Sequence, residues 1–93
     1  MSFDIFLERF QNGDSAEAPR EVFAACLAKF RAEPLEDHWY RVHFEDGTSA
    51  VVSASHADRS ERFSGCLVEP EGVGSGLASF LMTISRECGM AIM

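Results

Sequence analysis

The segment Gly72-Val73-Gly74-Ser75-Gly76 is the part of this sequence closest to a ligand-binding motif. Glycine-rich turns that enter a helix can present backbone N–H groups to a phosphate, and an amphipathic helix is expected directly after Gly76. A dinucleotide-binding fingerprint would require glycine where Leu77 stands, and a P-loop would require Gly-Lys-Ser/Thr. Glu69 and Glu71 also place negative charge beside the segment. Two interpretations stay open: a flexible entry to the helix, and a ligand loop made of Gly72, Gly74, Ser75 and Gly76.

The stretch from Leu67 to Ala78 also resembles the loop that binds the acyl-CoA pyrophosphate in acetyltransferases of the GNAT superfamily, where a strand, the motif Arg/Gln-x-x-Gly-x-Gly and a helix follow one another. Gly74 and Gly76 correspond to glycines of that motif. Glu71 stands where the family has Arg or Gln, and the chain is much shorter than that fold normally needs. The resemblance implies, as an alternative function, a small-ligand-binding or acyltransferase-like domain.

Cys26, Cys66 and Cys88 are odd in number, widely spaced and set among apolar neighbours. Cysteines in this arrangement do not form a disulfide framework, so a reducing compartment is expected. Their predicted role is to fill the hydrophobic core rather than to supply reactive thiolates.

The histidines do not form a predicted metal site. His38 and His43 are an odd number of residues apart on one predicted strand, so their side chains point to opposite faces. His56 and Asp58 fall in a predicted loop, and two ligands are too few for a zinc site. No nucleophile elbow is present, and no pair of acids is forced to the separation that acid–base catalysis needs. We therefore predict neither a metal nor a cofactor, and a binding protein rather than an enzyme.

Size and charge narrow the classes of partner. The chain has 93 residues, 46% hydrophobic and 25% charged, as expected for a single globular domain spanning residues 1–93. Its formal net charge of −7 repels nucleic-acid phosphates and anionic lipid, so no nucleic acid and no membrane is expected as a partner. Met1-Ser2-Phe3-Asp4 has an acid where a signal peptide needs Lys or Arg. These features predict a cytoplasmic protein.

Hydrophobic periodicity and turn residues predict seven elements in the order β-α-β-β-β-α-β. The fold class that follows is α+β, a two-layer sandwich in which both helices pack on one face of a mainly antiparallel sheet. The predicted elements are a strand at Phe3–Phe10, a helix from Pro19 to near Ala32, strands at Asp37–Glu45, Thr48–Ser53 and Arg62–Val68, a helix between Gly76 and Gly89, and a short strand at Met90–Met93.

The dipeptide Asp46-Gly47 predicts a two-residue type I′ hairpin. That turn would pair Val42 with Val51 and Phe44 with Ser49. The predicted core face then holds Tyr40, Val42, Phe44 and Val51. The opposite face would carry Trp39, Arg41 and His43 beside Ala50, Val52 and Ala54.

The sheet face away from the helices is the predicted interaction surface. It mixes exposed apolar side chains with charge, and Trp and Arg often anchor protein interfaces. The predicted partner-binding residues are Phe6, Phe10, Trp39, Arg41 and His43. Three occupants stay open: a partner protein, a second copy of the chain, and a missing part of a longer chain. The abrupt apolar end at Met93 is compatible with the N-terminal part of a longer domain and with an end that a neighbour protects.

The opening Met1-Ser2-Phe3-Asp4-Ile5-Phe6-Leu7, followed by Phe10 and Asn12-Gly13, resembles a group of small uncharacterised bacterial proteins, some of which are similar to immunity proteins of polymorphic toxin systems. The likeness covers the first strand and turn, and members with this opening are longer. It implies a bacterial cytoplasmic protein that binds another protein, immunity- or antitoxin-like. The group has no defined catalytic motif, so no functional residue is carried over.

Overall fold

The computed structural model describes residues 4–36, 38–54, 63–72 and 74–92. Within these residues the chain forms two helices, a six-stranded sheet and a small two-stranded ribbon, which confirms the α+β class. The elements are β1 (Ile5–Glu8), β2 (Phe10–Gln11), β3 (Asp14–Ser15), α1 (Arg20–Lys29), β4 (Glu33–Pro34), β5 (Trp39–His43), β6 (Ser49–Ser53), β7 (Gly65–Glu71), α2 (Ser75–Cys88) and β8 (Ala91–Ile92).

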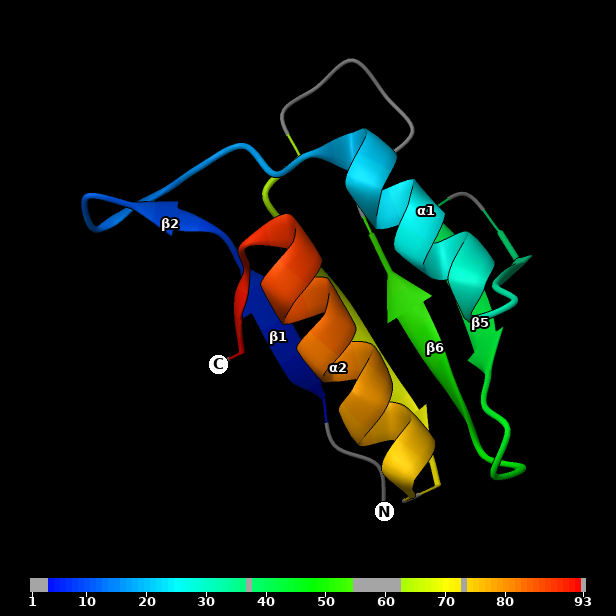
Figure 1. The fold of residues 1–93 in the computed structure, drawn as a ribbon. Coiled ribbons are helices and arrows are strands. Elements are labelled where there is room, and N and C mark those ends of the chain that lie inside the picture. Colours follow the sequence, from blue (N-terminus) through cyan, green and yellow to red (C-terminus); the bar gives the residue numbers. More distant parts are fainter. Residues whose placement is uncertain (1–3, 37, 55–62, 73, 93) are drawn as a thin grey trace.

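The six strands lie in the order β4-β5-β6-β7-β1-β8, and each neighbouring pair is antiparallel. Both helices pack against the same face of this sheet (Figure 1). This two-layer arrangement is the one that the single apolar stripe of each helix predicts.

The first strand is shorter than predicted. It ends at Glu8 because the chain then folds back on itself as the β2–β3 ribbon, which pairs Phe10 with Ser15 and Gln11 with Asp14. Both residues at the tip, Asn12 and Gly13, have positive φ angles, of 55° and 85°, which is the geometry of a type I′ turn. The ribbon projects away from the sheet (Figure 1), so Phe10 does not share a face with Phe6 as predicted.

The β5–β6 hairpin has a three-residue loop rather than the predicted two-residue turn. The Phe44 N–H donates to the Thr48 carbonyl at 2.9 Å, the Gly47 N–H donates to the Phe44 carbonyl at 3.2 Å, and Gly47 has a φ of 89°. This is a type I turn followed by a left-handed glycine. Asp46 keeps a negative φ, and its carboxylate accepts a hydrogen bond from the Thr48 N–H at 2.9 Å.

The extra loop residue shifts the register of the hairpin by one position. Val42 pairs with Ala50, and His43 pairs with Ser49. A shift of one residue exchanges the two faces of a strand, so the predicted facing of β6 was wrong. Ala50, Val52 and Ala54 are fully buried under the helices, whereas Val51 lies on the other face.

Strand β7 starts later and runs further than predicted. Pro70 does not end it but lies within it, buried and paired with Ala50. Because the bond between Phe44 and Thr48 makes Val42–Ala50 a hydrogen-bonded pair, Ala50 turns its backbone groups toward β5. Pro70 therefore loses no bond to β6 by lacking an N–H. Arg62, the predicted start of this strand, lies outside the described residues.

The first helix ends sooner than predicted, at Lys29. The Ala32 N–H donates to the Leu27 carbonyl at 2.9 Å and the Arg31 N–H to the Ala28 carbonyl at 3.1 Å, with Arg31 at a φ of 56°. This Schellman motif turns the chain into β4. The second helix ends at Gly89, at a φ of 66°, as predicted.

Aromatic rings join the two layers at the core. Phe80 of α2 is fully buried, with its ring centroid 5.0 Å from that of Phe30 and 5.9 Å from that of Phe44. Phe30 follows α1, and Phe44 follows β5, so one ring of α2 contacts both the other helix and the hairpin. A second pair, Phe23 and Phe63, has centroids 5.0 Å apart.

Replacing Phe80 should therefore destabilise the whole fold. Phe80→Ala is expected to lower the free energy of unfolding by about 3–5 kcal/mol, because it leaves a cavity among the rings of Phe30 and Phe44. Met82→Ala, two positions away and 61% exposed, should change it by about 0.5 kcal/mol or less. Urea unfolding of both variants measures the difference, and equal losses would contradict this account of the core.

Candidate functional site

We call the sheet face that carries no helix the outer face. Side chains alternate between the two faces along each strand, so the neighbours of the buried core residues point to the outer face. The outer-face side chains belong to Phe6, Glu8, Glu33, Trp39, Arg41, His43, Ser49, Val51, Ser53, Leu67, Glu69, Glu71 and Ala91.

An apolar row crosses the outer face at right angles to the strands. The register pairs Phe6 with Leu67, Leu67 with Ser53, and Ser53 with Trp39, so these four side chains span β1, β7, β6 and β5. Phe6 is 52% exposed, and the other three are half-buried. Trp39 also stacks with His38, with 6.0 Å between ring centroids and 25° between ring planes. One exposed and one half-buried aromatic side chain thus mark the two ends of one row.

Charged side chains occupy the neighbouring rows. The Nε of Arg41 lies 3.1 Å from an Oε of Glu71, which also accepts a hydrogen bond from the Ser49 hydroxyl at 3.0 Å. The Nε2 of His43 lies 3.3 Å from a carboxylate oxygen of Glu33. Both contacts are well exposed, so the Arg41–Glu71 ion pair adds about 1 kcal/mol of stability or less. Their main effect is to hold the side chains of Arg41 and His43 against carboxylates.

Four of the five predicted partner-binding residues lie together on the outer face: Phe6, Trp39, Arg41 and His43. Phe10 lies on the separate β2–β3 ribbon, 46% exposed. Sequence reasoning missed Leu67, although the alternation of Leu67, Glu69 and Glu71 with buried neighbours along β7 could have placed it. It also missed Val51, because the predicted hairpin register placed that residue in the core.

The glycine segment contacts the hairpin closely. A Cβ atom at Gly76 would overlap the Phe44 side chain, and one at Gly74 would overlap the Asp46 carboxylate. Gly74 precedes α2 without a capping side chain, and the Gly76 N–H instead donates to an Oδ of Asp46 at 3.0 Å. These glycines thus have a packing role, and a carboxylate of the chain itself occupies the position where a ligand phosphate would bind. The ligand loop at Gly72, Gly74, Ser75 and Gly76 stays a prediction, with Val73 outside the described residues.

The three cysteines lie near one another in the core, on different elements. The thiols of Cys26 in α1 and Cys88 in α2 share a hydrogen bond, and Cys66 in β7 is close enough to interact electrostatically with Cys88. Burial raises the pKa of Cys66 and of Cys88 to about 12. All three are free thiols that fill the core. In the part of the chain that the structure describes, no group of three His, Cys, Asp or Glu side chains could hold a metal ion.

His56 and Asp58 lie outside the described residues. Among the described helices, neither has the length and apolar character needed to cross a membrane.

Asp46 gives the contact between hairpin and helix a pH dependence. Hydrogen bonds from the Thr48 hydroxyl, the Gly76 N–H and the Thr48 N–H lower the pKa of its carboxyl group below the ordinary 3.8. Because the pKa of Asp46 is lower in the folded state than in the unfolded state, its ionised carboxylate stabilises the fold at pH values above 3.8. This stabilisation is lost as the pH falls through the folded-state pKa. Asp46→Asn should therefore lower the unfolding temperature at pH 7, and its difference from the wild type should shrink below pH 3.8.

Thermal unfolding followed by circular dichroism from pH 7 to pH 2.5 measures this difference. Glu45→Gln is the matched control, because the same loop holds Glu45 without a hydrogen bond or ion pair to any described residue. A difference for Asp46→Asn that stays constant down to pH 2.5 would show that the carboxylate does not stabilise the helix start.

The buried thiols should be unreactive in the folded protein. Ellman's reagent requires a thiolate, so all three cysteines are expected to react only when guanidinium unfolds the chain. Met82→Cys places a thiol on the exposed side of α2 and serves as the reactive control. A wild-type thiol that reacts as fast as this control in the native state would contradict the burial of the cluster.

Comparison of the chain with protein-family models, with curated proteins and with solved structures gives no match.

Proposed function

We propose that this chain is a small acidic protein-binding module whose outer face docks a partner protein. The observation that carries the proposal is the apolar row formed by Phe6, Leu67, Ser53 and Trp39, which no described helix covers. Aromatic side chains that are partly exposed and lie in a line across a sheet bury apolar area when a partner packs on them. Trp is among the residue types that contribute most to interface energetics.

The charge around this row favours a partner with a basic surface. Glu8, Glu33, Glu69 and Glu71 lie on the outer face, whereas Arg41 lies beside Glu71 and the imidazole of His43 lies beside Glu33. Glu69 forms no ion pair with a described residue. The chain as a whole carries −7. A cationic rim around an apolar centre is therefore the complementary surface, and the negative field would speed its approach.

Within this function, an immunity- or antitoxin-like role is the finer proposal. The resemblance of the opening Met1–Leu7 to bacterial proteins of that kind supports it. The charge also supports it, since toxins that act on nucleic acids need basic surfaces to hold a polyanion, and an acidic module can compete for the same surface.

Self-association through the outer face or the last strand is the alternative assembly. A small-ligand-binding domain built on the Gly72–Gly76 loop is the alternative from another class.

The test is affinity capture from lysate of the organism that encodes the chain, followed by titration of the purified partner. The double variant Phe6→Ala, Trp39→Ala removes the two ends of the apolar row and should weaken binding by about tenfold or more. Met82→Ala is the matched control, because it removes an exposed apolar side chain from the helical side. The control should bind as the wild type does. Raising the salt concentration should slow association, because exposed charges are screened.

Three outcomes would contradict the proposal. The first is a partner that binds the double variant as tightly as the wild type, and the second is an association rate that salt does not change. The third comes from light scattering: a wild-type dimer that the double variant converts to a monomer would assign the outer face to self-association instead.

A further inference from the structure

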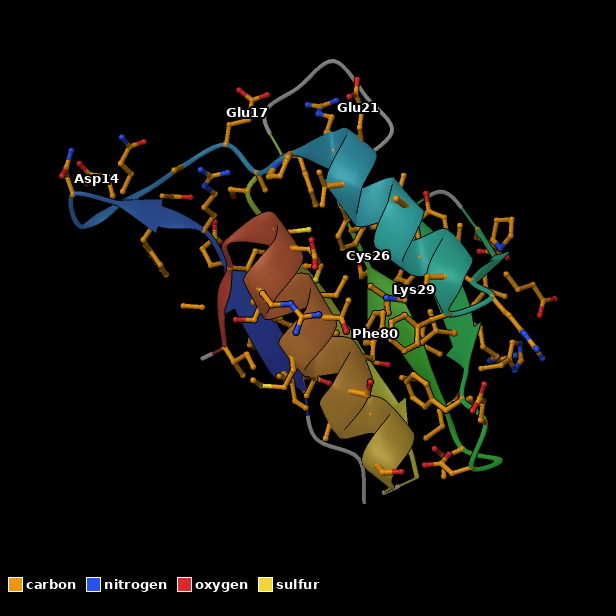
Figure 2. The ribbon with its side chains drawn as sticks, viewed as in Figure 1. Asp14, Glu17, Glu21, Cys26, Lys29 and Phe80 are labelled. Atoms are coloured by element: carbon orange, nitrogen blue, oxygen red, sulfur yellow. The ribbon has the colours of Figure 1, made fainter. Side chains whose placement is uncertain are left out.

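A cleft of about 470 Å³ lies at the end of the molecule where α1 ends and α2 begins, and His43 is the one described residue that it shares with the outer face. Its walls are the end of α1, the start of α2 and the loop of the β5–β6 hairpin. In Figure 2 the Lys29 side chain extends from the end of α1 toward α2. This volume lies within the range of small-molecule sites, about 300–1,000 Å³. The fold therefore provides a concave site that the proposed docking of a protein does not use.

The apolar part of the cleft is aromatic. Phe30 and Phe44 line it, with ring centroids 6.1 Å apart and ring planes at 85°. The buried ring of Phe80 packs against both of them and fixes their positions. Rings held in this way accept a flat apolar group by edge-to-face or offset contact.

Two cations line the cleft from the end of α1. Lys29 and Arg31 form no ion pair with any residue that the structure describes, although the chain carries an excess of acids. Arg31 has a φ of 56°, at the position after a helix where glycine is the usual residue. Its backbone conformation thus costs free energy at a residue that lines the cleft. The α1 end supplies a cationic wall suited to a carboxylate.

Acids line the cleft from the hairpin. Glu45 has no hydrogen bond or ion pair to a described residue, whereas Asp46 is bonded to Thr48 and Gly76. The carboxylate of Glu45 can therefore accept from an ammonium group without losing a bond to any described residue. His43 also lines the cleft, and its imidazole already lies beside Glu33. Cations on one element and an acid on another give the cleft both signs of charge.

We propose that this cleft binds a small zwitterion with a flat apolar side chain, which is the chemistry of a free aromatic α-amino acid. Its carboxylate binds Lys29 and Arg31, its ammonium group binds Glu45, and its ring packs on Phe30 and Phe44. A zwitterion has no net charge, so the field of a chain at −7 does not oppose its entry as it would oppose a phosphorylated ligand.

Isothermal titration with L-phenylalanine tests the ligand class. Binding with a dissociation constant in the millimolar range or below is expected. Two analogues each lack one charge: 3-phenylpropionate has no ammonium group, and phenethylamine has no carboxylate. The affinity of each analogue should be lower than that of L-phenylalanine by about tenfold or more, because each analogue loses a hydrogen bond between charged groups. L-Alanine keeps both charges without the ring and should also bind more weakly.

Arg31→Gly separates ligand binding from folding. Glycine suits the left-handed conformation at this position, so this variant should unfold at a higher temperature than the wild type without ligand. It should nevertheless bind L-phenylalanine about tenfold more weakly. Arg86→Gln is the matched control, because it removes a cation from the exposed last turn of α2 and should bind as the wild type does. Lys29→Gln provides a second variant that leaves the backbone of the helix end unchanged.

The proposal is overturned if 10 mM L-phenylalanine gives neither heat nor a rise in the unfolding temperature. It is also overturned if both single-charge analogues bind as tightly as L-phenylalanine, or if Arg31→Gly and Lys29→Gln both bind it as the wild type does. The double variant Phe6→Ala, Trp39→Ala should keep its affinity for L-phenylalanine. The proposal for the cleft and the proposal for the outer face can therefore be refuted independently of each other.

Discussion

Asp46 holds the β5–β6 hairpin in a three-residue loop and joins that loop to the start of α2. Its carboxylate accepts hydrogen bonds from Thr48 within the hairpin and from the Gly76 N–H of the helix. The loop sets the register, and the register decides which side chains of β6 face the helices. If the loop were one residue shorter, Val51 would enter the core, and Ala50 and Val52 would reach the outer face. The residues that β6 contributes to the core, and the place of Ser53 in the apolar row, thus depend on the loop that this contact holds.

The two surfaces proposed to bind other molecules lie on opposite sides of the sheet and use different chemistry. The outer face is broad, crossed by Phe6, Leu67 and Trp39, and bordered by carboxylates. The cleft is concave and carries both signs of charge, with Lys29 and Arg31 at the end of α1. They have the sheet in common, since Phe44 continues the strand that presents Trp39 on its other face. A partner on one side could therefore affect the other through the sheet between them or through His43, which belongs to both surfaces.

The predictions from sequence were correct where a local pattern determines the structure. They were wrong where contacts between distant residues determine it. The apolar spacing of α2 and its end at Gly89 were correct, because helix periodicity and a left-handed glycine are local signals. The hairpin position was correct but its register was wrong, since Asp46 bonds to Thr48 and the distant Gly76 instead of adopting a positive φ. The cleft was not predicted, because Lys29, Glu45 and Phe44 meet only when the helices pack.

Strand β4 limits the addition of further strands at one edge of this sheet. It consists of only two residues, Glu33 and Pro34, and it forms one edge of the six-stranded sheet. Proline has no N–H to offer a further strand, and a charged residue beside it adds a desolvation cost to edge-on pairing. The addition of a foreign strand at this margin, the route by which many sheets polymerise, is therefore discouraged. On the β4 side, another molecule is therefore expected to contact the face of the sheet rather than its edge.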